Sequence, residues 1–218
     1  MKTTSPSSTA ATITGYAFPT YPARPVNGGP PRVARPKVGL WITQPKFNGW
    51  RSLVHLAPDG TTPVWNRHGE RLTIASDFSD ALAAAAAAFP KGTWLDCEAL
   101  QRRGSIRNTL VILDIILPDL PWTSRKALLN ASGVPVLPWN YMPAKDYGFS
   151  HGRLVITDEI PADFSLHAAC EHFALVNTDM AETVFEGVVM KKADSTYPFQ
   201  TRSPGTRCPY WVKHRFVG

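Results

Sequence analysis

The chain has 218 residues, of which 44% are hydrophobic and 18% charged, so it can bury one sizeable core or two small ones. No run of 18 apolar residues is present, which excludes a membrane-spanning helix and argues against a membrane partner. The three cysteines are widely spaced and odd in number, which argues against a disulfide framework and predicts a reducing, cytoplasmic location. The formal net charge of +6 indicates a polyanionic partner.

Residues 1–36 are rich in Ser, Thr, Pro and Gly and show no sustained hydrophobic period. This composition predicts an extended, poorly ordered arm that carries Arg24, Arg32 and Arg35. A solvated tail and an ordered arm that touches nucleic acid are both compatible with it. Residues 37–218 are predicted to form a single folded domain.

The rest of the chain combines predicted strands with a few predicted helices. Asn48 and Gly49 predict a turn or a bulge between the first two strands, and the apolar run 110–117 is typical of a buried central strand. This mixture predicts an α+β fold of largely antiparallel sheets flanked by helices. The expected helices are residues 76–89, capped by Ser76 or Ser79, 123–131, capped by Thr123, and 164–176. The expected strands are residues 38–43, 50–56, 62–66, 92–100, 110–117, 184–191 and 210–216.

Basic residues interrupt several of these strand-like segments. Lys46 and Arg51 flank the first predicted turn, and Lys191, Lys213 and Arg215 lie in the last two strands. Because side chains alternate along a strand, Lys213 and Arg215 share one face, which indicates a bound anion there. An ordinary lysine, with a pKa of about 10.4, is neutral in only about one molecule in 2,500 at pH 7, and nearby cations increase that fraction. The pattern therefore fits a nucleophilic lysine that attacks a nucleotide phosphate.

Six short segments follow one another along the chain: residues 46–51, 66–69, 95–100, 113–116, 186–191 and 211–215. In that order they resemble the KxDGxR, SRxG, LDGEL, FDxL, EGxxxK and WxKxK motifs of the covalent nucleotidyltransferases. That superfamily includes the ATP-dependent polynucleotide ligases and the RNA capping enzymes. The resemblance spans residues 44–215 and implies the nucleotidyltransferase (adenylation) domain of an ATP-dependent DNA ligase.

The resemblance also implies the chemistry of the matching residues. Lys46 would attack the α-phosphate of ATP, form a lysyl–AMP intermediate and expel pyrophosphate, after which AMP would pass to a 5′-phosphate at a nick. Glu186 and Lys213 would be the other catalytic residues. The residues implied in ATP binding are Gln44, Lys46, Arg51, Arg67, Glu98, Leu113, Lys191 and Lys213.

Further roles follow from the same resemblance. Gln44 would read the adenine edge, and Arg51 and Glu98 would hold the ribose. Glu186 and Glu98 would hold Mg²⁺ or Mn²⁺. The residues implied in nucleic-acid binding are Arg67, Arg202 and Arg207.

The sequence departs from the family pattern at informative positions. Asn48 stands where the family has aspartate, and Leu113 stands where it has an aromatic residue that stacks on the base. Loss of the aspartate charge predicts a slower late step such as nick sealing, so restoring aspartate is expected to raise sealing. In the family an OB-fold domain that clamps nucleic acid follows the last motif. For this sequence we expect an adenylation domain without it, completed by a separate clamp protein or by the N-terminal arm.

Nicked duplex DNA is the predicted substrate. RNA ligation is an alternative, and so is a catalytically impaired module that binds nucleic acid or nucleotide. Asp114, which interrupts an apolar run, is interpreted as a structural residue. His167 and His172 lie five residues apart and would point away from each other on a helix, so no zinc site is predicted there.

Overall fold

The computed structural model describes residues 21–30, 40–100, 108–140, 153–200 and 207–216. Its α-helices are α1 (Ser79–Ala88), α2 (Trp122–Ala131) and α3 (Leu166–Asp179), and a 3-10 helix, η2 (Thr73–Phe78), leads into α1. None of the described helices is both long enough and apolar enough to cross a membrane.

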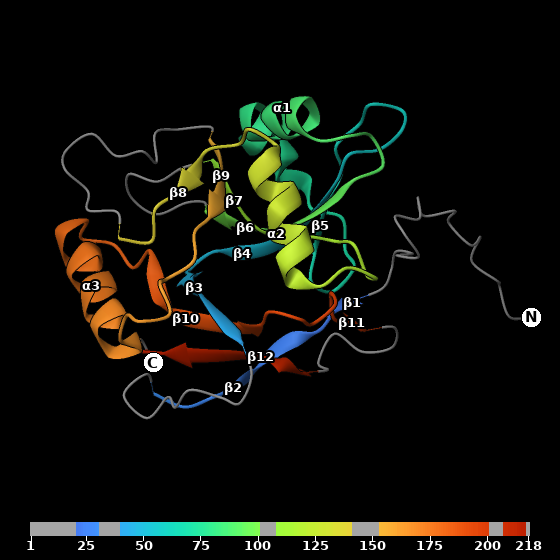
Figure 1. Cartoon of the computed structure of the whole chain (residues 1–218). Helices are drawn as coiled ribbons and strands as arrows, with labels where there is room; N and C mark the ends of the chain where they lie inside the picture. The colour runs from blue at the N-terminus through green and yellow to red at the C-terminus, as the bar shows by residue number, and fades with distance from the viewer. Residues whose placement is uncertain (1–20, 31–39, 101–107, 141–152, 201–206, 217–218) are drawn as a thin grey trace, which may run out of the picture.

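The strands form two principal sheets (Figure 1). The six-stranded sheet has the order β5-β4-β6-β7-β9-β8, with strands Val64–Asn66, Trp50–His55, Trp94–Leu100, Thr109–Ile115, Leu154–Thr157 and Val136–Leu137. The four-stranded sheet has the order β2-β12-β10-β3, with strands Arg24–Asn27, Arg207–Arg215, Phe185–Lys192 and Trp41–Phe47. A short pair joins β1 (Tyr21–Pro22) to β11 (Phe199–Gln200). Most pairs are antiparallel, which confirms the predicted α+β class.

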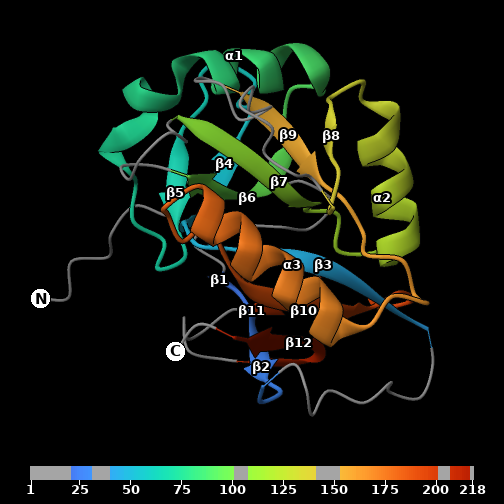
Figure 2. The ribbon, with the colours of Figure 1, turned by 90° about the vertical axis from the view of Figure 1, so that its left-hand side faces the viewer.

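The helices cover the sheets on two sides (Figures 1 and 2). α1 and α2 lie over the outer face of the six-stranded sheet, where Ala81 and Leu129 share an apolar cluster with Leu95. α3 packs beside the four-stranded sheet, where Phe173 stacks on Phe185 with ring centroids 4.6 Å apart. The faces of the two sheets that these helices do not cover are turned toward each other.

Strand β7 confirms the expected central strand. It lies between β6 and β9 in the six-stranded sheet, and both of its faces are largely buried. Leu110 and Ile112 belong to the cluster under α1 and α2, whereas Val111 packs in the cluster with α3. A run of apolar residues is the expected pattern for a strand with cover on both sides.

Two predicted helix caps are wrong. α1 follows directly on η2, so its N-cap position is Phe78, and no side chain caps it. The N-cap position of α2 is Pro121 rather than Thr123. Ser165 does cap α3, accepting a hydrogen bond from the backbone N–H of Ala168 at 3.4 Å. In the first helix the preceding 3-10 turn takes the place of a polar cap.

The predicted turn at Asn48 and Gly49 links the two sheets. β3 pairs with β10, and β4 pairs with β6, so the chain crosses from one sheet to the other at this point. β3 also continues through Phe47, which places Lys46 on a strand. A Cβ on Gly49 would lie 2.6 Å from the carbonyl oxygen of Ala99, so only glycine fits this close crossing.

Residues 21–27, part of the predicted poorly ordered arm, form strands instead. β2 pairs in parallel with β12, so that Arg24 lies opposite Arg207 and Val26 opposite Val212. β10 pairs with one side of β12, and β2 pairs with the other. This pairing satisfies backbone N–H and C=O groups of β12, a driving force that the composition of residues 21–27 does not indicate. The domain boundary near residue 37 stays a prediction, and Arg32 and Arg35 lie outside the described residues.

Candidate active site

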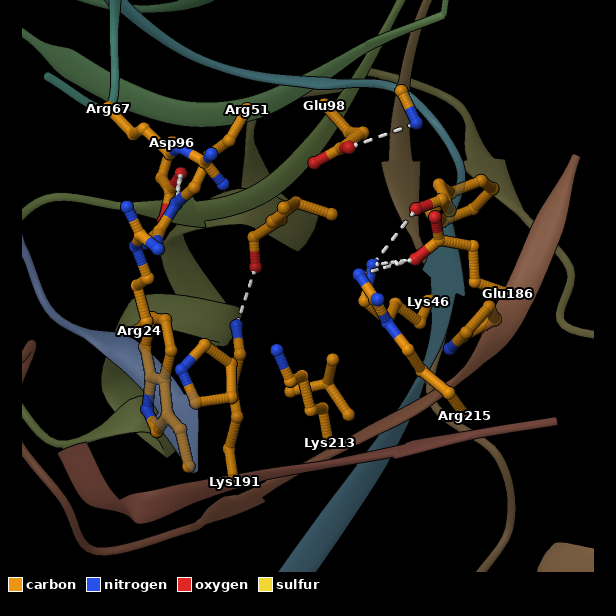
Figure 3. A pocket seen from close by; sticks show the side chains of 17 residues that line it. Arg24, Lys46, Arg51, Arg67, Asp96, Glu98, Glu186, Lys191, Lys213 and Arg215 are labelled. Carbon is orange, nitrogen blue, oxygen red and sulfur yellow. Dashed lines mark hydrogen bonds and ion pairs between the residues drawn. The ribbon is translucent and has the colours of Figure 1, made fainter. Parts of the chain in front are cut away.

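A pocket lies between the two sheets and collects most of the predicted site residues (Figure 3). Seven basic and three acidic side chains are part of its lining, so its charge favours an anionic ligand. The six-stranded sheet and the turn after β5 contribute Arg51, Arg67, Asp96, Glu98 and Leu113. The four-stranded sheet contributes Arg24, Lys46, Glu186, Lys191, Lys213 and Arg215.

A β-bulge at Gly187 allows β10 to present its polar side chains to the pocket. The register of β10 against β3 shifts between Phe185 and Gly187, and Gly187 has a φ of +150°. In a regular strand Glu186 and Val189 would point to opposite faces, yet both line the pocket. A Cβ on Gly187 would lie 2.0 Å from the carbonyl oxygen of His214, so a side chain cannot be accommodated.

Lys46 and Glu186 form an ion pair at one side of the pocket. Both side chains are largely buried, with about a fifth of each exposed (18% and 19%). Arg215 joins them, with Nη2 3.1 Å from the same carboxylate oxygen of Glu186. The amine of Lys46 also donates to the carbonyl of Phe47 at 3.4 Å. The predicted nucleophile is therefore held in the pocket beside a carboxylate that can accept its proton.

Glu98 lies on β6 on the same side as Asp96. Burial raises the pKa of Glu98 to about 7, although Lys46, Arg51 and the backbone N–H of Gly49 act in the opposite direction. That N–H donates to Glu98 Oε1 at 3.0 Å. Near neutral pH Glu98 is thus able to change its protonation state.

The two predicted phosphate-binding lysines differ in their surroundings. Lys191 is buried, donates to the carbonyl of Leu113 at 2.9 Å and lies 3.3 Å from Asp114. Burial lowers the pKa of Lys191 to about 8, despite Asp114. Burial also lowers the pKa of Lys213, as do the cations Arg215 and Lys46. Lys213 has no ion pair within the described part of the chain, so it is the more available of the two for an anion.

Arg51 reaches the pocket but is already paired there. Its Nε and Nη2 donate to the two carboxylate oxygens of Asp96 at 2.9 and 2.7 Å. Asp96 also accepts from the hydroxyl of Tyr197 at 2.7 Å. Burial alone would lower the pKa of Arg51, but Asp96 holds it above its usual value. Asp96 is not among the site residues predicted from the sequence, although strand alternation places it on the same face as Glu98.

Two of the described site residues are not part of the pocket lining. Gln44 is buried, with its side-chain Nε2 lacking a hydrogen-bond partner among the described residues. Arg207 is exposed and lies at the start of β12. Arg202 lies outside the described residues. Arg24, by contrast, does line the pocket, although it belongs to the segment predicted as an arm.

The structural interpretation of Asp114 agrees with its contacts. Asp114 is fully buried and forms a paired set of hydrogen bonds with Arg125, at 2.8 and 3.1 Å. No group of three or more His, Cys, Asp or Glu residues that could hold a metal ion occurs among the described residues. His167 pairs instead with Glu171 on the exposed face of α3.

The two facing sheets with the pocket between them form the fold of the DNA ligase domains to which this structure is similar. The crystal structure of the ligase domain of Mycobacterium tuberculosis LigD matches 90% of this chain with a TM-score of 0.56 and 20% identity. A mycobacterial DNA ligase D complexed with ATP and MES also matches 90%, with a TM-score of 0.56 and 21% identity. A Lig E DNA ligase matches 88% of this chain and 68% of that chain, with a TM-score of 0.50 and 12% identity. The fold implied by the sequence motifs is confirmed.

The amino-acid sequence is also similar to that of a curated protein. It is 28% identical over 194 residues to the multifunctional non-homologous end joining protein LigD of Mycolicibacterium smegmatis. The match covers 84% of this chain and 22% of that protein. The chain also spans 59% and 60% of the two LigD structures. A scan against models of known protein families finds no match.

Proposed function

We propose that this chain is the adenylation domain of an ATP-dependent polynucleotide ligase that acts on nicked duplex DNA. The observation that carries the proposal is the placement of Lys46 beside Glu186 in a pocket where basic side chains outnumber acidic ones. The similarity in fold to ATP-dependent DNA ligase domains supports a ligase-like function, and the specific chemistry below is our inference.

In the first step the amine of Lys46 attacks the α-phosphate of ATP. A bond forms between Nζ and phosphorus, and the bond from phosphorus to the bridging oxygen of pyrophosphate breaks. Glu186, which is paired with the ammonium of Lys46, takes up the proton whose loss frees the amine for attack. The second proton, which the nitrogen loses on bonding to phosphorus, leaves with pyrophosphate. Lys213 and Arg215 stabilise the added negative charge, because both lie in the same pocket and Lys213 has no competing ion pair in the described part of the chain.

In the second step a 5′-phosphate oxygen attacks the phosphorus of lysyl–AMP. The bond between Nζ and phosphorus breaks, and the amine of Lys46 recovers its proton from Glu186. The product is a strand that carries AMP at its 5′ end, which a neighbouring 3′-hydroxyl can attack with release of AMP. Arg67, exposed at the rim of the pocket, and Arg207 are proposed to contact the nucleic acid.

The nucleoside of ATP would lie between the two sheets. Leu113 lines the pocket and offers an apolar surface to the adenine. The contact of Gln44 with the base edge stays a prediction, because Gln44 is buried outside the pocket lining. Arg51 and Glu98 stay the proposed ribose contacts. Arg51 would use the second N–H of Nη1, because its other donors bond to Asp96, Tyr197 and the carbonyl of Ala23.

The carboxylates of the pocket fit Mg²⁺ bound together with ATP. Mg²⁺ in nucleotide sites is held by one or two carboxylates plus phosphate oxygens, so a protein cage of three ligands is not required. Glu186 and Glu98 line the same pocket and would supply those carboxylates. When bound, the ion would offset the negative charge of the leaving pyrophosphate.

Labelling with α-³²P-ATP and Mg²⁺, followed by denaturing electrophoresis, tests the proposal. We expect a covalent label on the unsubstituted chain and none on Lys46→Arg, which keeps the charge and the pairing with Glu186. Lys91→Arg is the matched control, because the exposed Lys91 lies outside the pocket lining and its amine donates to the carbonyl of Pro58. The same label on Lys46→Arg, or none on the unsubstituted chain, contradicts the proposal.

Transfer assays with the labelled protein identify the nucleic acid. We expect AMP to appear on the 5′-phosphate of nicked duplex DNA faster than on nicked duplex RNA, and the reverse ranking favours RNA ligation. A separate clamp protein and a cytoplasmic location stay predictions from the sequence.

A further inference from the structure

Arg24 enters the pocket from β2, the strand that adds the N-terminal segment to the four-stranded sheet. β2 runs parallel to β12, and Arg24 lies opposite Arg207 in their register. Backbone pairing therefore fixes where the guanidinium of Arg24 can reach. No described acidic side chain forms an ion pair with it.

The surroundings of Arg24 are positively charged. Burial lowers the pKa of Arg24, and so do the charges of Arg67, Arg51 and Arg207. Asp96 is not available to pair with Arg24, because both of its carboxylate oxygens are bonded to Arg51 and one also accepts from Tyr197. The Nε of Arg24 is buried without a hydrogen-bond partner among the described residues. A buried donor among like charges calls for an anionic acceptor.

Arg24 and Lys46 occupy opposite sides of the pocket (Figure 3). Lys46 points toward Glu186 and Arg215, whereas Arg24 points toward Arg51, Arg67 and Asp96. A phosphate bonded covalently to Lys46 therefore leaves the cations on the other side unneutralised. A guanidinium is suited to such a site because its planar donors match two oxygens of one phosphate.

We propose that Arg24, together with Arg67, binds a substrate phosphate other than the α-phosphate that Lys46 attacks. Strand β2 then belongs to the active site and carries a substrate-binding residue. The inference rests on the proposed function, because it takes the substrates to be ATP and a 5′-phosphorylated strand. The terminal phosphates of ATP and the 5′-phosphate of the strand would both present phosphate oxygens to Arg24.

Separate measurement of the two half-reactions tests this role of Arg24. We expect Arg24→Gln to slow one half-reaction by about 10- to 100-fold, the range for loss of a charged hydrogen bond. Slower labelling of Lys46 assigns Arg24 to the terminal phosphates of ATP, and slower transfer of AMP from labelled protein assigns it to the 5′-phosphate. Arg24→Lys should recover part of the lost rate. Arg153→Gln is the matched control, because Arg153 is exposed and outside the pocket.

Thermal unfolding separates ligand binding from a structural role. Arg24→Gln removes repulsion between like charges, so its melting temperature should equal or exceed that of the unsubstituted chain. Rates of both half-reactions within about twofold of the unsubstituted values, or a clearly lowered melting temperature, overturn the inference.

Equilibrium binding provides a readout that requires no covalent step. If the unsubstituted chain forms no label, the proposed function fails, and binding still tests Arg24. We then expect Arg24→Gln to weaken binding of ATP, or to abolish the preference for a nicked duplex with a 5′-phosphate over one with a 5′-hydroxyl. Unchanged affinity for both ligands overturns the inference.

Discussion

Asn48, two residues after Lys46, bonds to the two residues just before β10 instead of lining the pocket. Its side-chain amide donates to the carbonyl of Thr183 at 2.9 Å, and its backbone N–H donates to the carbonyl of Val184 at 2.8 Å. The residue thus ties the crossing between the sheets to the strand that carries Glu186. A carboxylate at this position could not donate the side-chain hydrogen bond.

Asn48→Asp should therefore destabilise the crossing. We expect the free energy of unfolding to fall by about 1 kcal/mol, and the rate of Lys46 labelling to fall with it, because one donor is replaced by an acceptor facing a carbonyl. This is the opposite of the expectation from the family motif alone. Chemical denaturation and the labelling assay measure the two effects, with exposed Asn140→Asp as the control for the added charge. Faster labelling or sealing by Asn48→Asp would contradict this prediction and support the one made from the family motif.

Single residues also show how far the sequence predicts the site. Lys46, Glu98, Glu186, Lys191 and Lys213 all line one pocket, as expected for residues in motifs. The pairing of Arg51 with Asp96 depends on a contact between segments distant in sequence, and so does the lack of a partner for Arg24 Nε among the described residues. Periodicity within one strand identifies the face of a residue but not its partner on another strand.

At the scale of the elements, the sequence predicts where several strands lie better than it predicts which strands pair with each other. The apolar run around Ile112 and the alternation around Lys213 identified β7 and β12. The turn at Asn48 gave no sign that β3 and β4 would join different sheets, because a short turn is compatible with a hairpin or a crossing. Residues 24–27 lack a hydrophobic pattern, and β2 forms because β12 offers its edge.

The bulge in β10 is the element whose geometry most directly sets the site. Gly187→Ala should cost more than about 3 kcal/mol of unfolding free energy, because the new Cβ would lie 2.0 Å from a backbone oxygen at a φ of +150°. Gly60→Ala is the matched control, with a φ of +87° and no atom within 4 Å of the new Cβ, so about 1 kcal/mol is expected. Equal costs in denaturant unfolding would show that the bulge tolerates a side chain.

At the scale of the whole molecule, Asp114 connects three layers. It lies on β7 of the six-stranded sheet, pairs with Arg125 of α2, and contacts Lys191 of the four-stranded sheet. Lys191 lies in turn over the rings of Trp122 and Trp211, 4.2 and 4.6 Å from their centroids. The buried carboxylate of Asp114 thus connects a helix with both sheets that form the pocket.

Removal of the charge at Asp114 should weaken the whole assembly. Asp114→Asn leaves the buried cations Arg125 and Lys191 without their counter-charge, so we expect a loss of about 3–5 kcal/mol in unfolding free energy. Asp119→Asn makes the same change at an exposed position and should stay within about 0.5 kcal/mol. Because the carboxylate joins the layers, far-UV circular dichroism and tryptophan fluorescence should report one coincident, shifted transition. A loss below about 1 kcal/mol, or two separate transitions, would show that apolar packing alone couples the sheets.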